Sequence, residues 1–139
     1  QKDCVVISGG NYLTITPAHA DDVFEFNGGC SYHIPANNTY GGLGLMTSTS
    51  TNFANNRNFF HRSGQHSIGN GSAGGDEDKF EWITYADSCS GLGLTAGTTY
   101  YVRMIGQKHS SNNLTFNNAS GGQHEDGQHF LNFKHWKKA

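Results

Sequence analysis

Histidines occur in two pairs that would bind a metal ion if the fold brought them together. In the run GGQHEDGQHF, His124 and His129 are five positions apart and enclose Asp126, and His61 and His66 have the same spacing in FFHRSGQHS. The histidine pair of a helical zinc site is four positions apart, and a structural zinc site usually adds cysteines nearby. Neither condition holds here. We expect polar loops without a bound metal or other cofactor, with His124, Asp126 and His129 as the candidates if a metal does bind.

Acidic residues offer two other kinds of chemistry, calcium binding and glycoside hydrolysis. The run GGDED at 74–78 lacks the alternating ligands of an EF-hand loop. Glu25 and Glu81 lie on predicted strands, where alternation places them on a solvated face, opposite the faces of Phe24, Phe26, Phe80 and Trp82. The sequence also has no nucleophile elbow and no phosphate-binding glycine loop before a helix. We therefore expect no catalytic activity.

Aromatic side chains could stack against sugar rings while Asn, Asp and Gln supply hydrogen bonds. The candidates for such stacking are Tyr32, Tyr40, Trp82, Tyr85, Tyr101 and Trp136. Against this function, Trp82 shares its predicted face with Phe80, and aromatic residues on alternating strands usually enter the core. A carbohydrate-binding or lectin-like domain is therefore the alternative function and not the leading one.

The elements that must position these residues are short β-strands. Apolar runs rich in β-branched and aromatic residues alternate with turn clusters, and no stretch has a sustained helical period. The predicted strands cover residues 4–8, 11–16, 22–26, 30–34, 42–46, 57–61, 79–84, 98–105, 113–116 and 129–133. Glycine pairs between them, such as Gly28-Gly29 and Gly41-Gly42, are predicted turns. We predict one all-β domain over residues 1–139, a single β-sandwich of the immunoglobulin, fibronectin III or jelly-roll kind with about ten short strands.

The charge pattern excludes two classes of partner. The formal net charge is −2, and charged residues make up 14% of the 139 residues, against roughly 25% in typical soluble domains. A nucleic-acid-binding protein would carry a basic stripe, which is absent, and no apolar run reaches the ~18 residues that a membrane helix needs. We expect neither nucleic acid binding nor membrane insertion.

Several features favour an exported protein located outside the cell or on its surface. The sequence opens at Gln1 without an initiator Met, as a processed secreted chain does. Asn37, Asn70, Asn113 and Asn118 begin glycosylation sequons, which matter only in a eukaryotic source.

Three cysteines fit the same compartment, with one disulfide and one free thiol. We predict a bridge between Cys30 and Cys89, because each borders a strand in the middle of the fold, whereas Cys4 lies in the terminal strand. A pairing of Cys4 with either of the other two remains open.

One stretch resembles a known kind of sandwich. In GLGLTAGTTYYVRMIG, Leu94, Gly97 and Tyr100 occupy positions that resemble the L-x-P-G-T-x-Y-x-V run of fibronectin type III domains, with Ala96 where that family usually has Pro. The runs DVFEF and TAGTTYYVRM also resemble bacterial pre-peptidase C-terminal domains. The resemblance implies a tyrosine corner, in which the Tyr100 hydroxyl bonds back to the upstream backbone.

The N-terminal run KDCVVIS leads to the preferred function. Val5, Val6 and Ile7 form a short apolar strand that is followed at once by Gly9-Gly10, so residues 1–10 could leave their own domain and complete the sheet of a neighbour. An ordinary first strand within its own fold would have the same sequence. We predict a non-catalytic secreted structural protein that assembles with copies of itself into an extracellular filament or adhesive surface layer, with glycans as the other possible partner.

Overall fold

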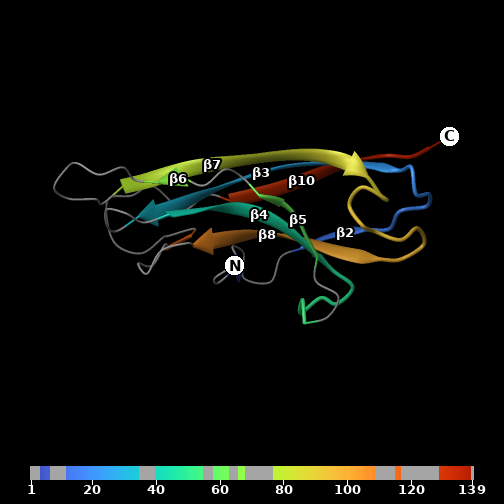
Figure 1. Cartoon of the computed structure of the whole chain (residues 1–139), viewed down its shortest axis with the longest axis horizontal. Coiled ribbons are helices and arrows are strands. Elements are labelled where there is room, and N and C mark those ends of the chain that lie inside the picture. Colours follow the sequence, from blue (N-terminus) through green and yellow to red (C-terminus); the bar gives the residue numbers. More distant parts are fainter. Residues whose placement is uncertain are drawn as a thin grey trace.

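The protein is described by a computed structural model that covers residues 4–6, 12–34, 40–54, 58–62, 66–67, 77–108, 115–116 and 129–138. Two antiparallel sheets packed face to face make up this part of the chain (Figure 1). Sheet A has the order β1 (Cys4–Val6), β8 (Tyr100–Lys108), β4 (Tyr40–Ser48), β5 (Asn58–Arg62), with β2 (Leu13–Ile15) also on β8 and β6 (His66–Ser67) also on β4. Sheet B has the order β10 (His129–Trp136), β3 (Val23–Ile34), β7 (Glu77–Ser88), with β9 (Thr115–Phe116) also on β3. The prediction of an all-β sandwich is confirmed in that the described residues form two packed antiparallel sheets.

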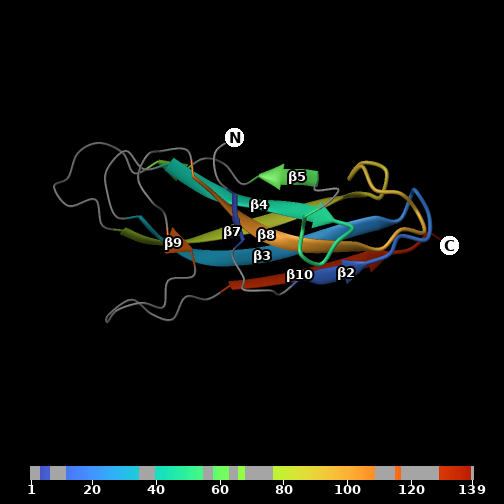
Figure 2. The same ribbon diagram turned by 90° about the horizontal axis from the view of Figure 1, so that it is seen from below.

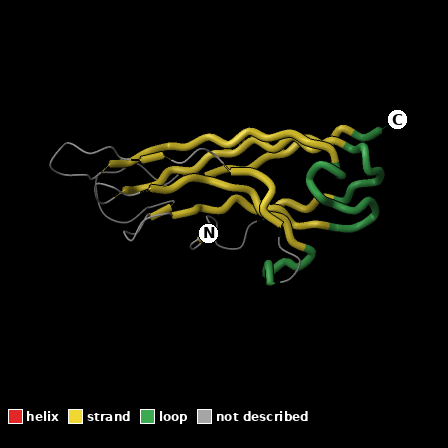
Figure 3. Tube along the Cα trace, viewed as in Figure 1, coloured by secondary structure: helices red, strands yellow, loops and turns green. Residues whose placement is uncertain are grey.

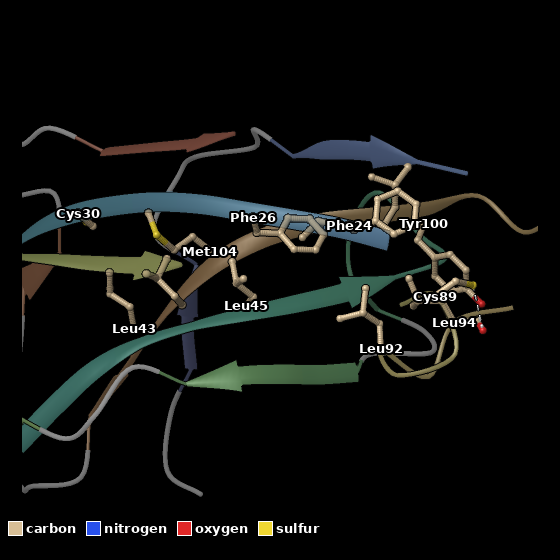
Figure 4. Packing of buried hydrophobic residues seen from close by; sticks show 13 residues of the cluster. Phe24, Phe26, Cys30, Leu43, Leu45, Cys89, Leu92, Leu94, Tyr100 and Met104 are labelled. Carbon is tan, nitrogen blue, oxygen red and sulfur yellow. Dashed lines mark hydrogen bonds between the residues drawn. The ribbon is translucent and has the colours of Figure 1, made fainter. Parts of the chain in front are cut away.

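The core lies between the two sheets because the strands alternate apolar and polar residues. On β3, Phe24 and Phe26 are fully buried, and on β4 Leu43 and Leu45 face them from the other sheet (Figure 4). Val102 of β8 is also fully buried in this cluster. Fully burying one such side chain contributes about 1.5–3 kcal/mol to folding, so this cluster is the main source of stability.

The loop at 49–54 covers part of the outer face of sheet A, around Met46 and Ile105. Phe53 of this loop is buried against Met46 and Ile105, and the Arg103 guanidinium lies 4.1 Å from the centre of the Phe53 ring. The Nη2 of Arg103 donates a hydrogen bond of 3.1 Å to the carbonyl of Thr51. The loop is thus held on sheet A by one buried ring and by the Arg103 side chain.

The two glycine pairs that the sequence placed in turns lie inside strands, so that prediction is wrong. Strand β3 runs without interruption from Val23 to Ile34 through Gly28 and Gly29, and β4 includes Gly41 and Gly42. A methyl group at Gly29 would lie 2.6 Å from the Phe80 ring, so the lack of a side chain at this position has a packing reason. The strands of sheet B are therefore longer than predicted.

The two faces of β7 are also reversed relative to the prediction. Ile83 is buried and Glu81 points to the same side, while Phe80 and Trp82 lie on the outer face and are exposed. The prediction that Glu81 faces solvent with the aromatic residues inside is wrong. Glu25, in contrast, is on the outer face of β3 as predicted.

Two short strands share one edge of β8. Val5 and Val6 of β1 pair with Gly106 and Ile105, and β2 pairs with residues 100–102 of the same strand. Figure 2 shows β2 towards the end of the sandwich where the C-terminus lies. Within this single chain, the N-terminal strand pairs with its own sheet.

Candidate ligand-binding face

The outer face of sheet B carries a row of aromatic side chains at one level of the sheet. Strand pairing places Phe130 of β10 and Trp82 of β7 on either side of Gly29 in β3. Phe80, two residues before Trp82, points to the same face because side chains alternate along a strand. Trp82 is 63% exposed and Phe80 is 40% exposed. We call Phe80, Trp82 and Phe130 the aromatic cluster.

The rings of the aromatic cluster touch one another across the central strand. The Trp82 ring centre lies 5.0 Å from that of Phe80 and 5.5 Å from that of Phe130, both in edge-to-face arrangements. Edge-to-face pairs at this distance are favourable beyond their buried area, which helps to hold the exposed indole in place. The cluster therefore presents one large ring to solvent, supported on two sides.

A row of neutral polar residues lies next to the aromatic cluster. Asn132 of β10, Asn27 of β3 and Thr84 of β7 lie side by side, two residues along the strands from Phe130, Gly29 and Trp82. All three are exposed. At about 3.3 Å per residue, the two rows are ~7 Å apart. Amide and hydroxyl groups can both donate and accept hydrogen bonds, so this row suits a ligand that has hydroxyl groups of its own.

The next row along the same face contains an ion pair. Lys134 and Glu25 are paired across β10 and β3, with the Lys134 Nζ 3.7 Å from Oε1 of Glu25. The Lys134 side chain is exposed and that of Glu25 is partly exposed, so this pair contributes little to stability. Because the two charges are opposite and adjacent, the pair adds no net charge to this face.

A buried carboxylate just before the start of β3 anchors the C-terminal segment. Asp22 is fully buried, and its Oδ2 accepts hydrogen bonds from the amides of Ala18 (2.7 Å) and His19 (3.3 Å) and lies 2.9 Å from His135 Nε2. Its Oδ1 accepts a bond of 3.1 Å from the amide of Lys138. Burial by itself would raise the pKa of the Asp22 carboxyl, but the bonds from Lys138, His135, Ala18 and His19 outweigh it and hold that pKa well below its ordinary value. The carboxylate is therefore charged and acts as a structural anchor.

Of the predicted corner residues, Leu94 and Gly97 lie in the loop before β8 and Tyr100 is the first residue of β8. Thr95 donates a backbone hydrogen bond of 3.0 Å to the Tyr100 hydroxyl, so the contact expected between this hydroxyl and the upstream backbone is present. Leu94 packs in the core. Gly97 has a φ of 79°, a conformation that favours glycine, and its amide donates to the carbonyl of Pro17. The described loops at 16–22 and 89–99 lie together at this end of the sandwich (Figure 3).

The predicted bridge between Cys30 and Cys89 is wrong for this structure, because both thiols are buried and they form no disulfide with each other. Cys30 aligns with Glu81, whereas Cys89 follows the last residue of β7, so the two are more than ~20 Å apart along the strands. A disulfide requires Cα atoms within about 7 Å. Figure 4 shows the two cysteines at opposite ends of the core. Burial, and then the charge of Asp22, raises the pKa of the Cys89 thiol.

Other predicted site residues fall outside the described residues. These are His124 and Asp126 of the metal candidates, Ile7 of the N-terminal strand, and Asn37, Asn70, Asn113 and Asn118 of the sequons. His129 is the first residue of β10 and aligns with Cys30. Among the residues that the structure describes, no three His, Cys, Asp or Glu side chains lie close enough together to hold a metal ion.

Sequence reasoning found only part of the aromatic cluster. Trp82 and Trp136 were among the sugar-stacking candidates and both are exposed, whereas Tyr85 points inward and is half-buried, and Tyr101 packs against the cluster around Phe53. Phe80 and Phe130 were missed. The signal that could have found Phe80 is Ile83, since a buried Ile83 requires the even-numbered residues of β7 to face outward. The place of Phe130 depends on the register of β10 on β3, which no local pattern shows.

In comparisons with protein-family models, with curated proteins and with solved structures, the chain matched none. Within the part of the chain that the structure describes, no helix has the length and apolar character needed to cross a membrane.

Proposed function

We propose that the protein is a non-catalytic carbohydrate-binding module whose binding surface is the outer face of sheet B. The observation that carries this proposal is the exposed Trp82 indole, supported by Phe80 and Phe130 and bordered by Asn132, Asn27 and Thr84. A sugar ring has a flat face of C–H groups that stacks on an indole, and a rim of hydroxyl groups that suits neutral amides and hydroxyls.

The objection raised by the sequence no longer applies to Trp82. Its predicted face was expected to enter the core, but Ile83 occupies the core and Trp82 lies on the opposite face. An indole left 63% exposed forgoes much of the free energy that its burial would give, which favours a role in contacting a partner. On sheet A, by contrast, Phe53 of the loop at 49–54 is buried against Met46 and Ile105, and the half-buried Tyr101 packs against this cluster.

The test is a binding screen with a panel of neutral and charged polysaccharides by affinity electrophoresis. The wild-type protein should be retarded by at least one neutral polysaccharide, and Trp82→Ala should lose most of this retardation. Tyr12→Ala serves as the matched control, because Tyr12 is also an exposed ring but lies beside sheet A, 4.9 Å from Tyr101. Retention of binding by Trp82→Ala, or equal loss in both variants, would rule out the proposed surface.

Assembly with copies of itself is the second candidate function, and one observation favours it. Strand β1 has only three residues and is held at the edge of β8, while β2 occupies the same edge separately. The first strand could therefore move to a neighbouring subunit while β2 stays in place. Val5, Val6 and Ile7 would form the exchanged strand. Electron microscopy of the intact protein and of a variant without residues 1–9 tests this, since only the intact protein should form filaments.

We extend this proposal to the kind of β-sandwich and to the location of the protein. The hydrogen bond between Tyr100 and Thr95 supports a sandwich of the fibronectin type III kind. A domain that binds polysaccharide acts where polysaccharides are found, which supports secretion to the cell surface. The partners are then glycans or further copies of the chain, and no cofactor is needed for either.

A further inference from the structure

A second exposed tryptophan lies on the same face as the aromatic cluster. Trp136 is the last residue of β10, aligns with Val23 at the start of β3, and is 58% exposed. It points outward like Phe130, because the two residues are six positions apart on one strand. The outer face of sheet B therefore has one exposed ring system near the middle of β3 and β7 and another at the end of β10.

The spacing between the two ring systems is set by the strand register. Phe130 aligns with Gly29 and Trp136 aligns with Val23, which is a separation of six residues along β3. At about 3.3 Å per residue, this is ~20 Å along the strands. Trp82 is on β7 and Trp136 is on β10, so the line between the two indoles crosses the sheet diagonally. A single sugar ring can contact only one of them.

Most of the residues on the face between the two tryptophans are polar, and the exceptional residue is the exposed Ala86 of β7. The row of Asn132, Asn27 and Thr84 comes first, and the paired Lys134 and Glu25 come next. The described charges of this stretch cancel, so the surface offers no net charge to attract an ionic ligand. Amide and hydroxyl groups along the path can bond to the hydroxyl groups of successive sugars.

We propose that the ligand is an extended, uncharged polysaccharide chain that lies across sheet B and stacks on Trp82 at one end and on Trp136 at the other. This inference rests on the proposed function and adds the length and charge of the ligand. The two stacking sites act together because one chain connects them, so that binding at the second tryptophan becomes intramolecular once the first is occupied. Ligands too short to reach both sites gain nothing from Trp136.

The experiment is isothermal titration calorimetry with a length series of one neutral oligosaccharide, using the polysaccharide found in the screen as its source. For the wild-type protein, affinity should rise with length until the chain spans ~20 Å and then level off. Trp136→Ala should lower the affinity for the long oligosaccharides about tenfold, equivalent to about 1.4 kcal/mol, and leave the short ones unchanged. Trp82→Ala should weaken binding of every length, and Tyr12→Ala should weaken none.

The possible outcomes separate this inference from the proposed function. If Trp82→Ala weakens binding but Trp136→Ala has no effect at any length, the carbohydrate site stands and the extended chain is wrong. An equal loss for short and long ligands in Trp136→Ala overturns the inference too, because it indicates a general structural effect. If charged polysaccharides bind more tightly than neutral ones, the assignment of an uncharged ligand is wrong. If no oligosaccharide binds the wild-type protein, both proposals fail.

Discussion

The rings of Trp82 and Phe130 lie 5.5 Å apart although β7 and β10 are separated by β3. Strands two places apart in a sheet are separated by about 10 Å, so both rings must lean over the strand between them. They can do so because Gly29, the residue between them, has no side chain. The Phe80 ring fills part of the space above Gly29. The aromatic cluster therefore depends on one glycine.

Gly29→Ala should disturb the aromatic cluster with little loss of stability. Its added methyl group would lie 2.6 Å from Cε1 of Phe80 and 3.1 Å from Cε1 of Phe130. Both atoms are at the ends of side chains on the outer face, so the rings can rotate away. We expect a changed near-ultraviolet circular dichroism spectrum, weaker carbohydrate binding and a nearly unchanged melting temperature. An unchanged spectrum together with unchanged binding would contradict this role of Gly29.

Gly28→Ala is the matched control and should have the opposite effect. Its methyl group would lie 2.8 Å from the backbone carbonyl oxygen of Phe130 and 3.0 Å from Leu131. Backbone cannot move as easily as an exposed ring, so we expect a loss of stability of about 1–3 kcal/mol. Urea denaturation measures it, and equal stability of the two glycine variants would show that the packing around β3 is misjudged.

Tyr100→Phe removes one hydroxyl and leaves the ring in the core. The amide of Thr95 then loses its acceptor, which typically costs about 1–3 kcal/mol when the donor cannot reach water. Thermal unfolding should show a lower midpoint with an unchanged native circular dichroism spectrum. A midpoint equal to that of the wild type would mean that this bond does not stabilise the corner.

Asp22 should make folding stability depend on acid pH. Because the pKa of the folded Asp22 carboxyl is below its unfolded value of about 3.9, its contribution is fully present above about pH 5 and decreases as the pH falls through 4 towards the folded pKa. The wild-type unfolding midpoint should therefore fall over this range. Asp22→Asn should be less stable at neutral pH and should lose less stability on acidification; a parallel decline in both proteins would contradict the anchor.

Cys30 and Cys89 should not react with thiol reagents while the protein is folded. Both are buried, and burial raises the pKa of the Cys89 thiol, so little of the reactive thiolate forms at neutral pH. Mass spectrometry should find alkylation of both only after denaturation. Recovery of a peptide that links Cys30 to Cys89 from the native protein would contradict the described core.

The sequence predicted the fold class well because alternation is a local signal. Val23 to Phe26 and the run from Tyr100 to Met104 alternate clearly, and they form strands with the expected faces buried. The same signal fails for β7, because both of its faces carry large apolar residues, and only the packing against sheet A decides that Ile83 is inside.

The candidate site could not be predicted because it depends on the pairing of distant strands. Nothing in the sequence near Trp82 shows that Phe130 lies beside it, since their contact is set by the registers of β10 and β7 on β3. Gly29 appeared to be part of a turn, because a glycine pair is typical of turns and its role beneath two rings is visible only after the sheet has formed.

Carbohydrate binding by the outer face of sheet B is tested most directly by titrating the isotopically labelled protein with a neutral oligosaccharide and following it by two-dimensional nuclear magnetic resonance. The indole N–H signals of Trp82 and Trp136 can be assigned with the two single alanine variants. If the outer face of sheet B binds the sugar, the signals of the Trp82 indole and of the amides of Asn27, Gly29 and Thr84 should shift on addition of ligand, while signals of the loop at 49–54 on the other sheet stay in place. Shifts confined to other surfaces, or an unchanged Trp82 signal at saturating ligand, would contradict it.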